Sequence, residues 1–558
     1  MRMSGARIIV ESLLQEGVDT LFCYPGGSVI PVFDELYKNG HDIRLIIPRH
    51  EQGGGHAADG YARATGKVGV FIVTSGPGAT NTTTAIANAH MDSIPLVAIT
   101  GQVPRSKIGT DAFQEADITG ITLPITKANF IIDDVKELAP TLKKAFHLAR
   151  IGRPGPVLVD VPVNIQYDMT EFAYPREAEL NNHGPKKNGH PRQLKIAVKM
   201  LKGAKKPLVI AGGGVNFSDS TDLANKFCDV YHLPVVSTLM GHGICPQKEE
   251  LYYGGIGMHG SRYGNYAVQN ADLILALGVR FSDRILGDPQ SFAPGAKIIH
   301  VDIDPAEIGK NIDVHLPIVG HVRSVLEQLI GQAEIRNDRS RWINELQSQK
   351  QNFPMTYKKC GSLKPQHLIR LANKYFPEDT IVASDVGQNQ MWVAQYFRFR
   401  RPRSLLTSGG LGTMGFALPA AIGAKIGHPD REVLMFAGDG GFQMNIQELM
   451  TIKRYNLNVK MLVLDNGHLG MVRQWQELLC KKRYSGTVST DNPDFAKIAE
   501  AVGIHALKLD RSEDAEGTMQ RLAAADESML VHAHIDPAEN VLPMVPVGKS
   551  LDHVLTSI

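Results

Sequence analysis

Residues 432–441 read Glu-Val-Leu-Met-Phe-Ala-Gly-Asp-Gly-Gly, and residues 459–467 read Val-Lys-Met-Leu-Val-Leu-Asp-Asn-Gly. In each stretch a short apolar run ends in a turn that carries glycine and aspartate. The runs are apolar throughout rather than alternating, which is typical of parallel strands covered on both faces. The residues between them suffice for one helix. The two stretches therefore predict a strand–helix–strand unit, the building block of an α/β fold.

Similar apolar runs alternate with helical stretches along the whole chain, in three blocks. Polar segments at 181–192 and 336–364 separate the blocks. We therefore expect an α/β protein with three doubly wound parallel-sheet domains, near residues 1–180, 190–340 and 360–540. The expected strands are 45–48, 68–74, 95–100 and 156–161, then 207–211, 233–237, 273–277 and 298–301, and finally 381–383, 432–436, 459–464 and 529–533.

The quoted stretches also carry a candidate metal site. Asp439 and Asn466 each follow a strand of the same unit, and parallel strands bring their carboxyl ends to one sheet edge. Carboxylate and amide oxygens suit Mg²⁺, which usually completes its coordination with phosphate oxygens and water. Gly438, Gly440 and Gly441 would let the backbone approach a phosphate at a helix start. The alternative is that Asp439 caps a helix and the Asp-Asn-Gly segment is an ordinary turn.

The composition excludes several classes of function. The chain has 558 residues, 43% of them hydrophobic, and 59 Lys+Arg balance 57 Asp+Glu, so no charge footprint for nucleic acid or a membrane surface is expected. No apolar run is long enough to span a bilayer, and residues 1–17 predict an amphipathic helix rather than a signal peptide. Five scattered cysteines without C-x-x-C spacing argue against a disulfide scaffold or a cysteine zinc site. These features favour the cytoplasm.

The sequence resembles a known family. The stretch Gly438-Asp439-Gly440 followed by Asp465-Asn466 is similar to the Mg²⁺–thiamine diphosphate motif. Further stretches resemble the catalytic subunits of acetohydroxyacid synthases (acetolactate synthases), and the resemblance covers nearly the whole chain. These stretches are 24–27, 49–53, 75–81, 101–103, 109–115, 152–156, 257–260, 412–416 and 470–476.

The resemblance implies thiamine diphosphate and Mg²⁺ as cofactors. Asp439 and Asn466 match the metal ligands, with the backbone carbonyl of His468 as the third. Met414 matches the apolar residue beneath the bend of the coenzyme, although an ordinary core methionine is the alternative. The coenzyme-binding positions by resemblance are Gly26, Gly27, Pro77, Asn81, Val386, Gly387, Gln388, Asn389, Gly412, Met414, Gly438, Gly440, Gly441, Leu469, Gly470, Met471 and Val472.

The resemblance also implies a reaction: decarboxylation of pyruvate and ligation of the two-carbon unit to a second 2-ketoacid, pyruvate or 2-ketobutyrate. Glu51 matches the glutamate that activates the coenzyme through its aminopyrimidine ring. Arg284 matches the residue that holds the acceptor carboxylate, and Trp475 the residue that favours 2-ketobutyrate. Phe113 and Gln114 would line the pocket near the reacting carbon. On their own, Arg284 could be a surface ion pair, Trp475 a core residue and Gln114 a loop amide.

The second block resembles the FAD domain of the family, where FAD would be structural because the net reaction is not a redox reaction. Gly212, Gly213 and Gly214 follow an expected strand and could equally be a dinucleotide-phosphate turn or a structural one. The FAD contacts by resemblance are Arg153, Gly212, Gly213, Gly214, Thr238, Leu239, Met258, His259, Gly278, Arg280 and Asp302.

The chain departs from the family pattern at four places. Val163 replaces a lysine of the substrate channel, Asn389 a histidine near the diphosphate, Ser282 an aspartate, and His321 an aspartate at the end of the FAD domain. These departures leave room for another thiamine diphosphate carboligase or 2-ketoacid decarboxylase. A non-catalytic flavin- or nucleotide-binding subunit is the alternative from a different class.

The resemblance finally implies an assembly. Glu51 and the Asp439–Asn466 pair would come from different subunits, so that a homodimer is obligatory and a homotetramer is open. A regulatory small subunit is a further possible partner.

Overall fold

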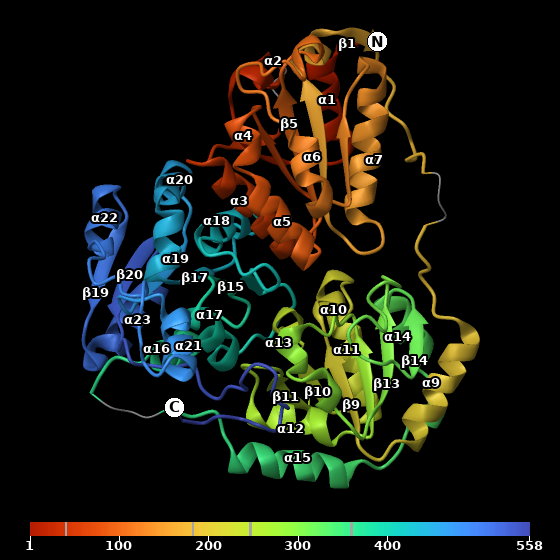
Figure 1. The fold of residues 1–558 in the computed structure, drawn as a ribbon, viewed down its shortest axis with the longest axis vertical. Coiled ribbons are helices and arrows are strands. Elements are labelled where there is room, and N and C mark those ends of the chain that lie inside the picture. The colour runs from red at the N-terminus through yellow and green to blue at the C-terminus, as the bar shows by residue number, and fades with distance from the viewer. Residues whose placement is uncertain (39–41, 181–183, 245–247, 358–360, 558) are drawn as a thin grey trace.

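The computed structural model describes residues 1–38, 42–180, 184–244, 248–357 and 361–557. Three sheets of six parallel strands each dominate this part of the chain. Figure 1 shows them as three blocks: red to orange at the top, yellow to green at the lower right, and cyan to blue at the lower left. The expected three-block α/β architecture is confirmed.

The N-terminal sheet has the order β3-β2-β4-β5-β7-β6. Its strands are β2 (Thr20–Tyr24), β3 (Arg44–Ile46), β4 (Gly69–Val73), β5 (Leu96–Gln102), β6 (Ala128–Ile131) and β7 (Pro156–Pro162). The helices of this block are α1 (Gly5–Gln15), α2 (Ile30–Lys38), α3 (Glu51–Thr65), α4 (Pro77–Thr80), α5 (Thr83–Asp92), α6 (Ile118–Thr122), α7 (Leu138–Arg150) and α8 (Val163–Tyr167).

The central sheet has the order β11-β10-β9-β12-β13-β14. Its strands are β9 (Pro207–Ala211), β10 (Val235–Ser237), β11 (Tyr252–Gly255), β12 (Leu273–Leu277), β13 (Lys297–Asp302) and β14 (Leu316–Val319). Its helices are α9 (Pro191–Gly203), α10 (Gly213–Phe217), α11 (Thr221–Tyr231), α12 (Arg262–Asn270), α13 (Asp283–Leu286), α14 (Val322–Leu329) and α15 (Ser340–Asn352).

The C-terminal sheet has the order β16-β15-β17-β18-β20-β19. Its strands are β15 (Ile381–Ser384), β16 (Leu405–Thr407), β17 (Val433–Gly438), β18 (Lys460–Asp465), β19 (His505–Leu509) and β20 (Met529–His534). Its helices are α16 (Pro365–Tyr375), α17 (Gln388–Tyr396), α18 (Ala417–Gly427), α19 (Asp439–Met444), α20 (Leu449–Arg454), α21 (Gly470–Leu479), α22 (Phe495–Ala501) and α23 (Ala515–Ala523).

Two expectations need correction. The N-terminus does not start as a helix: β1 (Arg2–Ser4) pairs antiparallel with β8 (Met169–Glu171), and Ser4 then caps α1. The segment 336–364 is more than a connector, because Trp342 on α15 is buried against the central block and donates to the carbonyl of Pro207. The residues after β20 also return to this block, where the amide of Val545 donates to the carbonyl of Met258.

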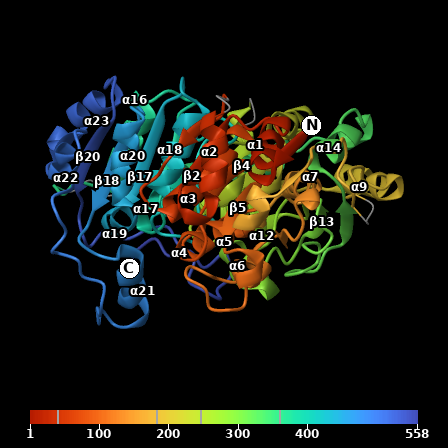
Figure 2. The same cartoon turned by 90° about the horizontal axis from the view of Figure 1, so that it is seen from above.

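Helices α3 and α18 join the N-terminal and C-terminal blocks through one continuous apolar core (Figure 2). Their backbones approach closely because small residues face each other. A Cβ on Gly423 would lie 1.9 Å from the carbonyl oxygen of Ala57, and one on Gly60 would lie 2.3 Å from that of Ala420. The contact therefore fixes how the two blocks sit within one chain.

This contact yields a first prediction. Gly423→Ala is expected to lower the free energy of unfolding by about 1–3 kcal/mol, because the added methyl group has no room against backbone. Gly517→Ala on α23 is the matched control, since nothing lies within 4 Å of the position that its methyl group would take and no loss is expected. Thermal unfolding of the two variants measures the difference. Equal midpoints would show that the helix contact is looser than described.

Candidate active site

The first candidate site lies where β17 and β18 end side by side, with Gly438 paired to Leu464. Asp439, the first residue of α19, is 2% exposed, and its Oδ2 accepts a hydrogen bond of 2.7 Å from the Asn492 amide. The same amide donates to Asp465 Oδ1 at 3.0 Å. The structure thus places Asp439 and Asn466 at one sheet edge, as the strand pattern predicts.

Burial raises the pKa of Asp439 to about 6, with the negative charge of Asp465 adding to the effect and the Asn492 hydrogen bond opposing it. A buried, charged carboxylate is unfavourable unless a cation balances it. Asn466 Nδ2 donates to Gln388 Oε1 at 3.2 Å, and Asn466 Oδ1 accepts from the amide of His468 at 3.0 Å. This oxygen-rich donor set fits Mg²⁺.

The surrounding backbone forms a cradle that side chains would fill. A Cβ on Gly440 would lie 3.1 Å from Leu469 and 3.3 Å from Met414, and one on Gly470 only 2.2 Å from Gln388 Oε1. Gly387 precedes α17 with a φ of 137°, a conformation that favours glycine. The residues present therefore fit a diphosphate held next to the metal. Asn389, the departure from the family here, turns its Oδ1 toward Gly387 and Gly438.

Glu51 lies in a second group of residues, at the start of α3. Its Oε2 accepts a hydrogen bond of 3.0 Å from the Asn81 amide, and a Cβ on Gly78 would lie 3.5 Å from its Oε1. The carboxylate of Glu448 fixes this helix start, because its Oε1 accepts from the amides of Arg49 and His50 at 2.9 and 3.1 Å. Among the described residues, no hydrogen bond or ion pair joins Glu51 to the Asp439 edge.

Gly26, Gly27 and Pro77 lie in the same block as Glu51, at the ends of β2 and β4. Phe113 is 88% exposed, and Gln114 adopts a φ of 60° beside Gly76. A single chain does not bring Phe113 and Gln114 together with the other expected substrate residues.

A cavity of about 1220 Å³ joins most of the remaining expected residues, and residues of all three blocks line it. It is larger than typical small-molecule pockets of about 300–1,000 Å³. From the coenzyme set it contains Val386, Gly387, Gly412, Met414, Met471 and Val472, and from the substrate set Arg284 and Trp475. From the FAD set it contains Arg153, Gly213, Gly214, Thr238, Leu239, Met258, His259, Gly278, Arg280 and Asp302.

Several of these residues, together with Gly212 next to the cavity lining, suit a large dinucleotide. Asp302 ends β13, and burial raises its pKa to about 6. A Cβ on Gly212 would lie 2.0 Å from the carbonyl oxygen of Gly278, so this turn requires glycine. Arg153 contacts Ser93 at 2.8 Å and Glu307 at 2.7 Å, which fixes it at the cavity wall. The residues present fit FAD, and the departures Ser282 and His321 are themselves in the lining.

Three residues had simpler interpretations from sequence: Met414 and Trp475 as core residues, and Arg284 as a member of a surface ion pair. Met414 and Trp475 are half-buried at the cavity rather than in an apolar core. The Arg284 side chain is 61% exposed, and its Nε lies 3.8 Å from Asp283 Oδ2, a long ion pair of little strength. Val163 begins α8 and does not line the cavity.

Sequence reasoning missed Asn492 and Glu448. Asn492 bridges Asp439 and Asp465 from a loop, and Glu448 supports the segment before Glu51 from the other end of the chain. Neither residue belongs to a recognisable motif. Among the described residues, every helix is too short or too polar to span a bilayer.

Three adjacent doubly wound blocks, with a sheet edge that fits Mg²⁺ and a glycine cradle that fits a diphosphate, are the arrangement expected of a thiamine diphosphate enzyme. Family models agree: the thiamine pyrophosphate enzyme N-terminal TPP-binding domain matches residues 3–121, the central domain 194–329, and the C-terminal TPP-binding domain 385–533. Thiamine pyrophosphate is another name for thiamine diphosphate.

Curated relatives narrow the class. The chain is 44% identical to a probable acetolactate synthase large subunit of Methanococcus aeolicus, over 100% of this chain and 96% of the relative. It is 43% identical to the acetolactate synthase large subunit of Lactococcus lactis, over 99% and 96%, and 46% identical to that of Corynebacterium glutamicum, over 98% and 89%. The chain belongs to the acetolactate synthase large-subunit family of thiamine diphosphate enzymes.

Proposed function

We propose that the chain catalyses the acetolactate synthase reaction, in which pyruvate loses CO₂ and the remaining two-carbon unit is joined to a second 2-ketoacid, pyruvate or 2-ketobutyrate. This reaction would serve branched-chain amino-acid biosynthesis in the cytoplasm. The observation that carries the proposal is a single cavity in which Met414 and Gly412 of the coenzyme cradle meet Arg284 and Trp475. We also propose that the chain is divided into three domains, at residues 1–180, 190–340 and 360–540.

The roles of the chain's own residues follow from their positions. Bound thiamine diphosphate would supply the electron sink for decarboxylation. Asp439, Asn466 and the carbonyl of His468 would hold Mg²⁺ against the diphosphate. Glu51 Oε2 is held by Asn81, which leaves Oε1 to share a proton with the aminopyrimidine ring.

The acceptor would be held by groups of the cavity. The planar guanidinium of Arg284 suits a carboxylate, and its position near Met258, 3.6 Å from the sulfur, lies next to the expected FAD contacts. Trp475 on α21 would contact the acceptor side chain. Half-buried residues around them would limit water at the reacting carbon.

The assembly is also part of the proposal. Phe113, Gln114 and Glu51 are outside the cavity of their own chain, and Phe113 is highly exposed. A second copy of the chain would bring these residues to the coenzyme, so the active unit would be a homodimer or a homotetramer. A regulatory small subunit would bind outside this catalytic core.

The test is formation of acetolactate from pyruvate, with thiamine diphosphate, Mg²⁺ and FAD each omitted in turn. We expect product only when thiamine diphosphate and Mg²⁺ are present, and loss of activity on removal of FAD. Acetaldehyde in place of acetolactate would assign the chain to the 2-ketoacid decarboxylases. Absence of any product would support a non-catalytic subunit.

Acceptor preference gives a second prediction. Trp475→Leu is expected to lower the preference for 2-ketobutyrate over pyruvate by about tenfold, because contact with one methylene group contributes only about 1–3 kcal/mol. Competition between the two acceptors, read out as the product ratio, measures the change. Leu479→Ala, an exposed position on the same helix, is the control and should keep the ratio. An unchanged ratio in Trp475→Leu would remove Trp475 from the acceptor site.

A further inference from the structure

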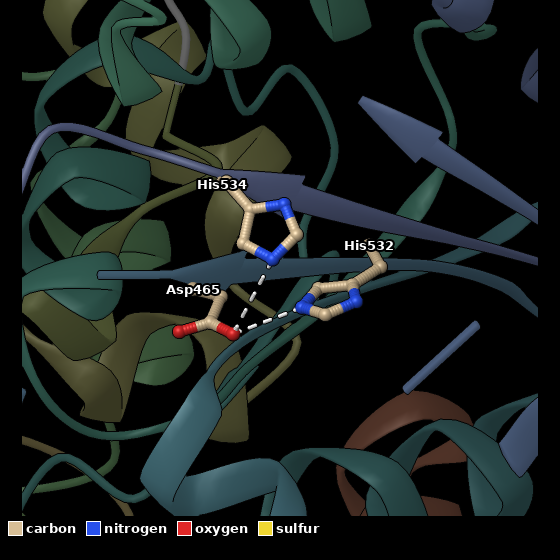
Figure 3. A group of neighbouring side chains, drawn as sticks. All are labelled: Asp465, His532 and His534. Atoms are coloured by element: carbon tan, nitrogen blue, oxygen red, sulfur yellow. Dashed lines mark hydrogen bonds and ion pairs between the residues drawn. The ribbon is translucent and has the colours of Figure 1, made fainter. Parts of the chain in front are cut away.

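Asp465, His532 and His534 gather at the carboxyl ends of β18 and β20, outside the cavity described above (Figure 3). The two histidines are two residues apart on one strand, so they point to the same face of the sheet. In the strand register Asp465 lies opposite His534. Local β geometry alone therefore brings two imidazoles and one carboxylate together.

The ring nitrogens of both histidines face the same carboxylate oxygen. Asp465 Oδ2 lies 2.9 Å from His532 Nε2 and 4.0 Å from His534 Nε2. Ligands about 2.0–2.2 Å from a tetrahedral Zn²⁺ lie about 3.3 Å from one another. The observed separations fall on either side of that value. His534 is 47% exposed and can move toward the others, while Asp465 and His532 are buried.

In Asp465 and His534, the atoms that face away from the proposed ion have hydrogen-bond partners, as is usual for metal ligands. Asp465 Oδ1 accepts from the amide of Gly467 at 2.9 Å and from Asn492 at 3.0 Å, which leaves Oδ2 as the single oxygen toward the histidines. His534 Nδ1 lies 2.6 Å from Asp510 Oδ1. Histidine ligands usually donate their second ring N–H to a carboxylate in this way, which directs Nε2 to the metal.

His532 also has a carboxylate near its second ring nitrogen, but at a longer distance. Its Nδ1 is buried and has no hydrogen-bond partner among the described residues, and Asp494 Oδ1 lies 3.9 Å away. The two imidazole rings lie side by side, with centroids 4.3 Å apart. Both Nε2 atoms can therefore reach one ion placed next to Asp465 Oδ2.

We propose that Asp465, His532 and His534 bind one divalent transition-metal ion of the Zn²⁺ class, in a site separate from the expected Mg²⁺ position. Two imidazole nitrogens select such ions over Mg²⁺, which prefers oxygen ligands. Three protein ligands leave a coordination position for water on the exposed side of His534. The site uses none of the three expected Mg²⁺ ligands, although the Asn492 amide links Asp465 to Asp439. The proposal does not rest on the reaction proposed above.

The test uses the full-length protein with saturating Mg²⁺, titrated with Co²⁺ and followed by visible ligand-field absorption, then with Zn²⁺ in competition. We expect one equivalent of Co²⁺, displaced by Zn²⁺ and not by Mg²⁺. His534→Ala should abolish the spectrum, and Asp510→Asn should weaken binding about 10–100-fold. The His534 and Asp510 side chains are 47% and 62% exposed, so these variants should fold, and an unchanged thermal midpoint checks this.

His505→Ala is the matched control, because His505 is a 77% exposed histidine on the adjacent strand β19 and lies outside the cluster. It should bind Co²⁺ as the parent does. An unaltered Co²⁺ spectrum in folded His534→Ala, or displacement of the ion by Mg²⁺, would overturn the proposal. So would equal affinity of the parent and Asp510→Asn.

Discussion

Glu51→Gln is expected to slow CO₂ release from pyruvate by about 10²–10⁴-fold, the usual contribution of a positioned proton-transfer group. The amide keeps the size of the side chain, and its oxygen can still accept the hydrogen bond from Asn81. It cannot exchange a proton with the coenzyme ring. Coenzyme binding should therefore change little while turnover collapses. The measurement is the rate of CO₂ release, with calorimetric binding of thiamine diphosphate in parallel.

Glu137→Gln is the matched control for this variant, because Glu137 is an exposed glutamate of the same block, next to α7. It should retain the parental rate. If Glu51→Gln released CO₂ as fast as the parent, the proposed role of this carboxylate would be wrong.

Asp439→Asn is expected to weaken Mg²⁺-dependent uptake of thiamine diphosphate by more than about 10–100-fold, the loss typical of residues that merely support metal ligands. The substitution keeps the shape of the side chain but removes its charge at the sheet edge. Isothermal titration with the coenzyme in the presence of Mg²⁺ measures the loss. Asp491→Asn, an exposed position beside Asn492, is the control and should bind normally.

Although it binds the coenzyme more weakly, the cofactor-free Asp439→Asn protein should be at least as stable as the parent. Burial raises the pKa of Asp439 to about 6, whereas the ordinary pKa that applies in the unfolded chain is 3.8. Ionisation of Asp439 therefore destabilises the cofactor-free fold progressively as the pH rises from about 3.8 to about 6. A neutral amide removes that effect at pH 8. A cofactor-free variant at least as stable as the parent, yet unable to bind, would identify a ligand rather than a structural residue. Normal coenzyme uptake by the variant would refute the metal site.

The inner strands of the sheets are predictable from sequence, whereas most edge strands are not. Strands such as β9, β12 and β17 are buried on both faces and read as continuous apolar runs. Of the six edge strands of these sheets, only β3 was predicted from sequence. The other five, β6, β11, β14, β16 and β19, were not. Edge strands contact solvent, and β19 is mostly exposed or half-buried, so its sequence carries a mixed pattern. The inner strand β2 was also missed, although all but its last residue are buried.

The candidate site divides in a similar way. Asp439 and Asn466 were predictable because each follows a strand directly, and topology then determines where their side chains meet. Asn492 and Glu448 were not, because loop and helix residues reach the site only through tertiary packing. The cluster of Asp465, His532 and His534 depends on the pairing of β18 with β20, which are far apart in sequence.

The central claim is that two chains share each coenzyme, one contributing Glu51 and the other the Asp439 edge. Inactive Glu51→Gln and Asp439→Asn proteins can be mixed under conditions that allow subunits to exchange, and acetolactate formation then measured. Random pairing should restore about a quarter of parental activity, since half of the dimers then hold one intact site of two. If both residues served the same site from one chain, every site would carry a defect and the mixture would stay inactive.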